Sequence, residues 1–436
     1  MLPGRWTTRP CTRYWLERTS SSRIWPLSIF DSSRSNRWTR PYRSRIFSSR
    51  SARLRYRSRT LRSQTRTNAA ARKVEYMTEL ASETTATHTP LRIALVGPVA
   101  QSIPPERSGS VETVTAMLAD GLVTQGQDVT LFATGSSETE AQLHAMFPNG
   151  YHHDSSMWPW ELCELFNLAA AVERAHQFDL IHYQAEYSPI SLAYTHVSPI
   201  PLLQTLHHAP VSTEIALWSR YPEAPFIAVS QTQAQLMSGL NVVQTIHHAV
   251  DPDLFTLGDA PQDYLLFLGR FTEGKGILSA IEVAKQTNHR LIIAAAENQY
   301  YRDTVRPLVD GQTIVYVGEV DLAAKISLLQ GARVLLYPVQ SGESFGLVMT
   351  EAMMCGTPVA ALDQGTVSEL VDDYVTGRVF QSLEALIREL DSVVTLDRTN
   401  VRSRALDRFN PEQMVDKHIK AYKKVLSSKQ SRQPRD

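Results

Sequence analysis

Residues 264–286 read YLLFLGRFTEGKGILSAIEVAKQ, and this stretch decides the fold class. The apolar run 264–268 has the length of a buried strand, the segment 269–276 is rich in glycine, and 277–286 has helical spacing. A strand that passes through a glycine-rich loop into a helix is the repeating unit of doubly wound parallel sheets. The stretch therefore predicts an α/β protein.

The same alternation of strands and helices recurs along most of the chain. The first series comprises expected strands at 91–96, 129–133, 180–183, 202–206, 226–229 and 242–246, with helices at 111–124, 162–175 and 232–238. The second series comprises expected strands at 264–268, 291–296, 314–317, 334–337 and 359–362, with a helix at 277–286. Pro252, Gly258 and Pro261 mark a connector between the two series.

These series predict two Rossmann-like domains of doubly wound parallel sheet that face a cleft. We expect the first domain at 77–252 and the second at 263–408. Residues 409–436 should contain a helix that packs across the hinge, because the apolar residues of 411–426 have helical spacing. Ligands of open parallel sheets bind beyond the carboxyl ends of the strands, so the site should lie in the loops that follow them.

Residues 1–76 differ in composition from the rest of the chain. They hold 18 Arg and one Lys against three acidic residues, whereas residues 77–436 hold 25 basic and 41 acidic residues. Such a basic segment cannot form a core, and we expect it to be disordered. Three interpretations are open: a translated upstream region with Met77 as the natural start, a solvated basic tail, or a targeting peptide. The acidic remainder argues against a nucleic-acid partner.

The cysteines and the hydropathy exclude further classes. Cys11, Cys163 and Cys355 lie far apart, which argues against a zinc site or a disulfide framework and favours a cytoplasmic location. No run of about 18 residues is continuously apolar, so we expect no membrane insertion. The oligomeric state is left open.

The glycine-rich loop carries two cations. Arg270 and Lys275 lie on one loop that opens a helix. An arginine can donate paired hydrogen bonds to a phosphate, a lysine supplies a point charge, and a helix N-terminus adds partial positive charge. We interpret the loop as a site for the diphosphate of a leaving nucleotide. The alternative is a turn with two solvated cations.

Two carboxylates follow the expected strand 334–337. Glu343 and Glu351 are eight residues apart, which corresponds to about 12 Å if a helix begins near Phe345. That distance roughly spans a sugar and a ribose. Glu343 lies in the loop, where it can accept hydrogen bonds from sugar hydroxyls, and the free amides of 344–347 favour phosphates. Glu351 precedes the apolar sequence AMMC, and a buried carboxylate there needs a partner.

Together these loops resemble a known family. The patterns GRxxxxKG at 269–276 and E(x7)E at 343–351, the latter followed by AMMCGTP, resemble the family 4 retaining glycosyltransferases, which have the GT-B fold. The resemblance covers about residues 91–380. It implies that Arg270 and Lys275 hold the donor diphosphate, that Glu343 faces the donor sugar, and that Glu351 binds the ribose. The turn with Val320 would contact the base through its backbone.

The resemblance also implies roles in the first domain. The family pattern Thr-x-His, here Thr205-Leu206-His207, would place His207 over the donor sugar. Gly109 and Ser110 lie where many relatives have two glycines, although Ser110 could instead be a helix cap.

The predicted site is thus drawn from both domains. The predicted catalytic residues are His207, Arg270, Lys275 and Glu343. The predicted donor-binding residues are Gly109, Ser110, Gly269, Arg270, Lys275, Val320, Glu343, Ser344, Phe345, Gly346, Leu347 and Glu351. We expect no metal and no cofactor apart from the nucleotide sugar, because the cations and the helix terminus already offset the charge of the diphosphate.

The expected partners are a nucleotide-sugar donor and a small-molecule acceptor. The resemblance favours UDP-glucose as the donor, and residues 263–270 are similar to cyanobacterial members that glucosylate tetrahydrobiopterin, which implies a pterin acceptor. The acceptor pocket is expected among residues that could equally be core, namely Trp158, Pro159, Trp160, Tyr183, Glu186 and Tyr187.

Three other functions are weighed against this interpretation. The first is a glycosyltransferase of lipid or polysaccharide synthesis. The second is a Rossmann-type oxidoreductase, although neither glycine loop has the GxGxxG pattern with an acid about 20 residues further on. The third is an RNA- or sugar-binding protein that uses the basic tail.

Overall fold

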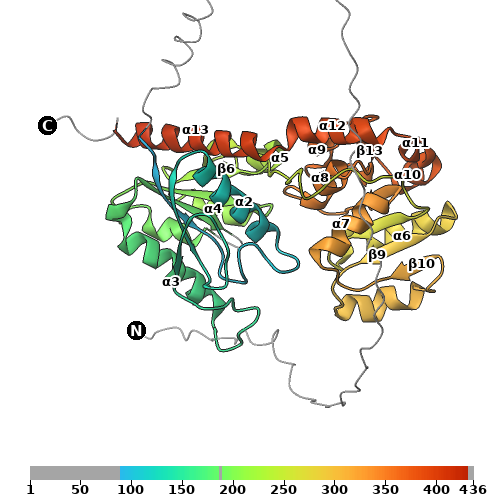
Figure 1. Ribbon diagram of the computed structural model, residues 1–436, viewed down its shortest axis with the longest axis horizontal. Coiled ribbons are helices and arrows are strands. Elements are labelled where there is room, and N and C mark those ends of the chain that lie inside the picture. Colours follow the sequence, from blue (N-terminus) through green and yellow to red (C-terminus); the bar gives the residue numbers. More distant parts are fainter. Residues whose placement is uncertain (1–88, 186–188, 431–436) are drawn as a thin grey trace, which may run out of the picture. The chain divides into compact units, whose positions relative to one another are not determined.

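The computed structural model describes residues 89–185 and 189–430, in which two parallel β-sheets are each flanked by helices (Figure 1). The expectations for residues 1–76, and those for Glu186 and Tyr187, lie outside the described residues. The described residues belong to one compact unit. The predicted fold class, α/β with two Rossmann-like domains, is confirmed.

The first sheet has the strand order β3-β2-β1-β4-β5-β6-β7, and all of its paired strands are parallel. Its strands are β1 (Arg92–Val96), β2 (Asp128–Ala133), β3 (Gln142–Ala145), β4 (Leu180–Ala185), β5 (Leu202–Leu206), β6 (Pro225–Ala228) and β7 (Asn241–Thr245). Its helices are α2 (Ser110–Thr124), α3 (Trp160–Glu173), α4 (Ser212–Trp218) and α5 (Gln231–Leu236).

The second sheet has the strand order β10-β9-β8-β11-β12-β13 and is also parallel. Its strands are β8 (Leu265–Leu268), β9 (Leu291–Ala294), β10 (Ile314–Tyr316), β11 (Val334–Tyr337), β12 (Val359–Leu362) and β13 (Gly377–Phe380). The helices of this half are α6 (Ile277–Gln286), α7 (Leu322–Gly331), α8 (Leu347–Met354), α9 (Val367–Leu370), α10 (Leu383–Glu389), α11 (Asp391–Val394) and α12 (Arg398–Arg408).

The central strands are buried on both faces. In β1 the residues from Ile93 to Val96 are fully buried, and β11 is buried along its whole length. Parallel strands are covered by crossover helices on both sides, so continuous apolar runs replace the alternation of a half-exposed strand. This is why short apolar runs followed by glycine-containing loops predicted these strands.

The last helix, α13 (Pro411–Gln430), returns to the first sheet. It packs against α2 and β7, and in Figure 1 it runs beside the first domain. Val415, Ala421 and Tyr422 belong to the same hydrophobic core as Ile93 and Leu118. Helix α13 therefore completes the hydrophobic core of the first sheet. The expected domain boundaries stay predictions.

Candidate active site

The glycine-rich loop 269–276, which carries Arg270 and Lys275, packs against the loop that carries Glu343. The loop leaves β8 at Gly269 and enters α6 at Ile277, and the backbone N–H of Gln340 donates to the carbonyl of Gly274 (2.8 Å). Gly276 has a φ of 73°, and a Cβ at this position would lie 1.8 Å from the carbonyl oxygen of Pro338. Only glycine fits such a contact, so the glycines bring the two loops together.

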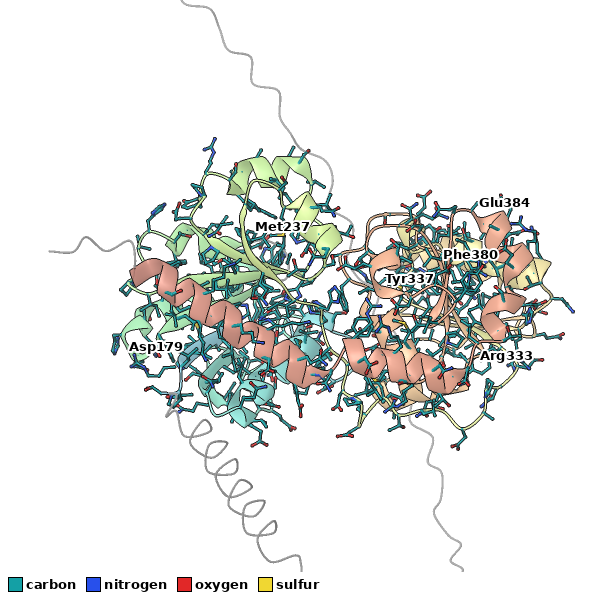
Figure 2. The ribbon with its side chains drawn as sticks, turned by 90° about the horizontal axis from the view of Figure 1, so that it is seen from above. Asp179, Met237, Arg333, Tyr337, Phe380 and Glu384 are labelled. Atoms are coloured by element: carbon teal, nitrogen blue, oxygen red, sulfur yellow. The ribbon has the colours of Figure 1, made fainter. Side chains whose placement is uncertain are left out.

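Lys275, Glu343 and Tyr337 form one polar cluster. The ammonium of Lys275 pairs with Oε2 of Glu343, and the hydroxyl of Tyr337 donates to the same oxygen (2.6 Å). The side chains of Lys275 and Glu343 are 24% and 17% exposed. Burial, together with the charge of Glu343, raises the pKa of Tyr337 well above its usual value, so its hydroxyl remains a donor. Figure 2 shows Tyr337 among the side chains of the second domain.

This cluster unites two predicted site residues and adds one that the sequence analysis missed. Lys275 and Glu343 are 68 positions apart in the chain. Tyr337 is the last residue of β11, six residues before Glu343. A tyrosine at the carboxyl end of a buried strand was the available signal, because a buried hydroxyl needs a hydrogen-bond partner.

Arg270 is exposed at the start of the same loop. Among the described residues its guanidinium has no ion-pair or hydrogen-bond partner. Gly269 precedes it, and a Cβ there would meet no atom within 4 Å. An uncompensated guanidinium just after the carboxyl end of β8 is suited to an anion.

The helix behind Glu343 begins later than expected. It was expected near Phe345, but α8 begins at Leu347, and Gly346 precedes it with a left-handed φ of 82°. The residues from Glu343 to Gly346 form a loop, so two helical turns do not separate Glu343 from Glu351. The estimate of about 12 Å between these residues, which assumed two turns, is therefore wrong for this segment. The left-handed glycine ends the loop and sets the direction of the helix.

Two other predicted donor-binding residues have side chains occupied by structural contacts. The hydroxyl of Ser344 donates to the carbonyl of His207 (2.7 Å), and the hydroxyl of Ser230 donates to the carbonyl of Ser344 (2.8 Å). Phe345 is 3% exposed, and its ring lies 4.7 Å from the ring of His248. Donor contacts from these two residues would therefore have to come from the backbone.

Glu351 is buried and has the partner that its apolar surroundings required. It is 2% exposed, and Lys325 of α7 donates to its Oε1 (2.6 Å). Burial raises the pKa of Glu351, and the nearby ammonium of Lys325 acts in the opposite direction. Lys325 could not be identified from the sequence, because the pair joins two different helices. The prediction of a buried carboxylate that needs a partner is confirmed.

His207 lies at the carboxyl end of β5, next to the loop of Ser344. Its Nε2 is 2.8 Å from Oε1 of Gln184, and its ring stacks on that of His248 with centroids 5.2 Å apart. Burial lowers the pKa of His207 to about 3, so the ring is uncharged at neutral pH. Gln184, a polar residue on the buried strand β4, was missed as a partner.

A group of buried histidines continues behind this residue. His182 is fully buried between the Tyr422 hydroxyl (2.8 Å) and the Thr205 hydroxyl (2.8 Å), and the ring of His418 lies 5.6 Å from it. Burial lowers the pKa of His182 well below its usual value and that of His418 to about 4. The imidazole rings that are buried behind His207 are therefore uncharged at neutral pH.

These histidines should make the protein sensitive to acid. The unfolded chain binds a proton on each histidine below about pH 6.5, whereas folded His418 does so only near its pKa of about 4, so stability is lost as the pH falls between these values. At about pH 5 the loss is about 2 kcal/mol for this residue. Thermal unfolding of His418→Gln should depend less on pH between about 5 and 7 than that of the wild type. The exposed His176→Gln variant is the control, and equal pH dependence in all three proteins would contradict this account.

Gly109 and Ser110, two predicted donor-binding residues of the first domain, follow the loop after β1. Helix α2 begins at Ser110 and its N-cap is Gly109, which makes no side-chain cap, so the alternative interpretation of Ser110 as a cap is wrong. Ser110 is exposed. Glu112, in the first turn, is 2% exposed, and burial raises its pKa. This second buried carboxylate was not selected from the sequence.

The same loop reaches the turn that contains Val320. The Ser108 hydroxyl is 3.4 Å from Oε1 of Glu319, and the Arg107 guanidinium is 3.6 Å from Oε2. Gly318 starts this turn with a φ of 83°, and Val320 is half-buried. These contacts, with that of His207 and Ser344, connect the carboxyl ends of strands from both sheets.

The structure also bears on the remaining predictions for the acceptor pocket, a metal site and membrane insertion. Tyr183 is 3% exposed and belongs to a hydrophobic core, so its alternative interpretation as core is confirmed, whereas Trp158 is 75% exposed. Within residues 89–185 and 189–430, no group of three or more His, Cys, Asp or Glu is placed to hold a metal ion. Over the same residues, no helix has the length and apolarity needed to cross a bilayer.

Two family models match successive parts of the chain. The model described as Glycosyltransferase Family 4 matches residues 111–254, and the model described as Glycosyl transferases group 1 matches residues 257–408. The first covers the helix α2 and most of the first sheet, and the second begins shortly before β8 and ends with α12.

The similar proteins are glycosyltransferases as well. Phosphatidyl-myo-inositol mannosyltransferase of Mycobacterium leprae is 23% identical over 78% of this chain and 98% of its own length. D-inositol 3-phosphate glycosyltransferase of Mycolicibacterium smegmatis is 24% identical over 80% of this chain and 94% of its own.

Solved structures share the fold. AviGT4, a glycosyltransferase involved in avilamycin A biosynthesis, is 23% identical, with a TM-score of 0.60 over 78% of this chain and 99% of its own. The sucrose-phosphate synthase of Thermosynechococcus elongatus is 20% identical, with a TM-score of 0.63 over 78% of this chain and all of its own. Fold, site and family models together define a glycosyltransferase of the GT-B class. Within that class, residues 111–254 match Glycosyltransferase Family 4 and residues 257–408 match Glycosyl transferases group 1, so both halves of the chain are those of a glycosyltransferase.

Proposed function

We propose that the protein is a retaining hexosyltransferase that moves glucose from UDP-glucose to a small-molecule acceptor, for which a pterin such as tetrahydrobiopterin is the leading candidate. The observation that supports this proposal best is the cluster of Lys275, Glu343 and Tyr337, with the uncompensated Arg270 on the same loop as Lys275. It offers two cations for a diphosphate and a fixed carboxylate for the hydroxyls of a sugar.

In the proposed reaction the acceptor attacks from the face that the diphosphate leaves. The acceptor hydroxyl oxygen forms a bond to the anomeric carbon, while the bond from this carbon to the diphosphate oxygen breaks and its electron pair stays on the diphosphate. The hydroxyl proton passes to the same diphosphate oxygen. Arg270, Lys275 and the N-terminus of α8 stabilise the charge that develops there, and stabilisation of such charge is the main contribution of the protein.

The remaining residues orient the donor. Glu343 accepts hydrogen bonds from the sugar, and Oε2 is already held by Lys275 and Tyr337, which leaves Oε1 for the donor. Glu351 receives the ribose hydroxyls, and the backbone at Val320 contacts the base. His207 contributes an uncharged ring beside the sugar, with its position held by Gln184 and Ser344. The transfer needs no metal ion on this proposal.

A second candidate is a glycosyltransferase of lipid or polysaccharide synthesis. It is favoured by the relatives named for transfer to phosphatidyl-myo-inositol and to inositol 3-phosphate. The oxidoreductase alternative is not retained, because both family models describe glycosyltransferases. The cytoplasmic location stays a prediction.

A donor screen tests the proposed function. Thermal unfolding of the full chain should be measured with UDP-, GDP- and ADP-linked sugars in the presence of EDTA, followed by UDP release with tetrahydrobiopterin as acceptor. We expect the largest stabilisation with UDP-glucose, because a ligand that binds only the folded state raises its stability. The transfer product should keep the anomeric configuration of the donor. No stabilisation by any nucleotide sugar, or activity that EDTA abolishes, would overturn the corresponding part of the proposal.

A further inference from the structure

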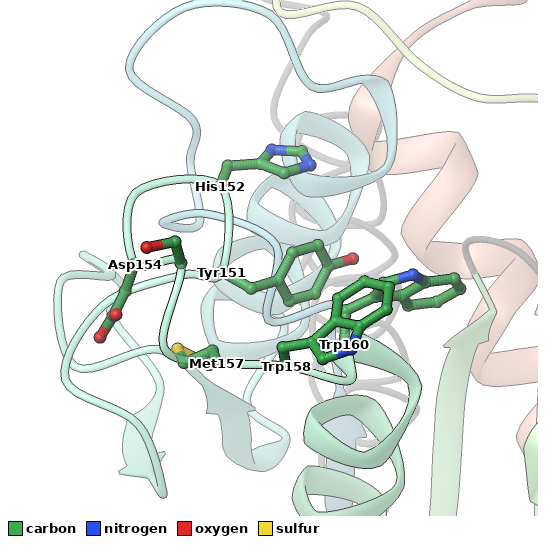
Figure 3. A pocket seen from close by; sticks show the side chains of 7 residues that line it. Tyr151, His152, Asp154, Met157, Trp158 and Trp160 are labelled. Atoms are coloured by element: carbon green, nitrogen blue, oxygen red, sulfur yellow. The ribbon is translucent and has the colours of Figure 1, made fainter. Parts of the chain in front are cut away.

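A cavity of about 530 Å³ opens beside the N-terminus of α3 in the first domain. It is lined by Tyr151, His152, Asp154, Ser155, Met157, Trp158 and Trp160 (Figure 3). Small-molecule sites commonly have volumes of about 300–1,000 Å³. We propose that this cavity binds the acceptor, and that the acceptor presents an uncharged or cationic ring without a phosphate. The inference rests on the proposed function and specifies the substrate class of its acceptor side.

The wall of the cavity is fixed to the carboxyl end of a central strand. The backbone N–H groups of Tyr151 and His152 donate to the carbonyls of Val99 (3.2 Å) and Ala100 (2.9 Å), just after β1. Gly150 allows this contact, because a Cβ there would lie 2.2 Å from the carbonyl oxygen of Ala100. The cavity therefore adjoins the edge at which ligands of open parallel sheets bind.

The strand order brings this edge within reach of the proposed sugar site. One strand, β4, separates β1 from β5, at whose end His207 lies. Neighbouring strands are about 4.8 Å apart, so the ends of β1 and β5 are separated laterally by about 10 Å. An acceptor ring of ordinary size that is bound near the end of β1 can therefore extend a hydroxyl toward the end of β5.

The lining offers aromatic surfaces for a ring. The side chains of Tyr151 and Trp160 have ring centroids 6.0 Å apart, and the ring of His152 meets that of Tyr151 edge-on at 5.1 Å. Trp158 is 75% exposed, and Figure 3 shows its indole at the cavity together with Trp160. An indole left in water loses the free energy that burial would provide, and a flat ligand that stacks on it would recover part of that free energy.

The charge of the lining selects against phosphates. None of the seven lining residues is Lys or Arg, and Asp154 is the one carboxylate among them. The backbone N–H (2.9 Å) and the hydroxyl (2.6 Å) of Ser156 donate to its Oδ1, and these bonds lower the pKa of Asp154. A fixed carboxylate repels a phosphate and accepts hydrogen bonds from N–H or O–H groups. This chemistry differs from that of the phosphorylated acceptors named in the relatives.

A membrane-bound acceptor is the competing interpretation of the same surface. Leu162 and Phe166 are four residues apart in α3 and are 42% and 49% exposed. This spacing places them on one face of α3, where a lipid surface would also cover them. Asp154 and Glu161 lie at the same end of this helix, and their negative charge disfavours an anionic bilayer.

The test compares acceptor kinetics of three variants in the full chain. Two acceptor probes distinguish two kinds of ring: tetrahydrobiopterin represents a heterocycle and methyl glucoside represents a sugar. With each probe, the release of UDP from UDP-glucose is measured. We expect Trp158→Ala to raise the KM of the accepted probe by about tenfold or more, and Trp158→Phe to restore most of the affinity, because base-type rings stack on aromatic side chains with useful energy. Leu162→Ala, on the exposed face outside the cavity, is the matched control and should keep the wild-type KM.

The outcomes separate this inference from the proposed function. If the wild type neither binds UDP nor hydrolyses UDP-glucose, the proposed function fails. If it hydrolyses the donor but transfers to neither probe, or if Trp158→Ala keeps the wild-type acceptor KM, the inference on the cavity is wrong while the donor site stands. Transfer that occurs only to phosphatidylinositol vesicles, and that Leu162→Ala and Trp158→Ala reduce alike, would assign the surface to a lipid acceptor and overturn the inference.

Discussion

Replacing Lys275 with alanine should lower kcat/KM for the nucleotide sugar by about 10²- to 10³-fold, the usual effect of removing one group that stabilises charge in a transition state. Lys275 lies in the loop before α6, and its ammonium is held by Glu343 at the carboxyl end of β11. On our account this charge stays close to the diphosphate as the sugar leaves. The measurement is initial rate of UDP release at several donor concentrations.

Two controls make this result specific. Lys285→Ala removes an exposed lysine from the last turn of α6, the helix that follows this loop, and should leave the rate within about twofold of the wild type. The thermal unfolding temperature of Lys275→Ala should remain close to that of the wild type, because the ion pair is partly exposed and Tyr337 still binds Glu343. A Lys275→Ala variant with near-normal kcat/KM would refute the role assigned to this lysine.

Glu343→Gln should weaken the binding of the sugar portion of the donor while sparing the nucleotide. A hydrogen bond to a charged group contributes about 1.5–3 kcal/mol, so UDP-glucose should bind about 10- to 100-fold more weakly. UDP lacks the sugar and should bind about as in the wild type. Calorimetric titration with both ligands measures the two effects separately, and equal weakening of UDP and UDP-glucose would contradict the assignment of Glu343 to the sugar.

Tyr337→Phe should reproduce part of that effect through Glu343. Tyr337 donates to Oε2 of this carboxylate, and the loss of one hydrogen bond of about 1 kcal/mol predicts roughly fivefold weaker binding of UDP-glucose. The double variant with Glu343→Gln should bind no more weakly than Glu343→Gln alone, because both changes act on one interaction. Additive losses would show that Tyr337 acts independently of Glu343.

The elements that the sequence predicted well are those with local signals. Helix α6 and strands β5, β11 and β12 have the expected bounds, since each is a short apolar run or an amphipathic stretch between glycines, prolines or polar turns. The segments β3, β13, α4, α7, α9, α10, α11 and α12 were missed. β3 lies at the edge of its sheet and is mostly exposed, so no hydrophobic pattern marks it.

The site residues follow the same division. Arg270, Lys275 and Glu343 could be selected because each lies in a loop directly after a predicted strand, where parallel sheets place their ligands. The partners of two other predicted residues could not, since Lys325 reaches Glu351 and Gln184 reaches His207 from other elements. Contacts between distant segments depend on packing, which periodicity does not encode. The later start of α8 has a related cause, because the left-handed Gly346 is a feature of the loop conformation.

The central claim is that Arg270, Lys275 and the N-terminus of α8 bind the diphosphate of a nucleotide sugar. It is tested most directly by titrating the wild type and Lys275→Ala with UDP and with uridine in a calorimeter. We expect UDP to bind the wild type at least about 100-fold more tightly than uridine, and this ratio to fall at least about tenfold in the variant. Equal affinities of the wild type for UDP and uridine, or a ratio unchanged in Lys275→Ala, would contradict it.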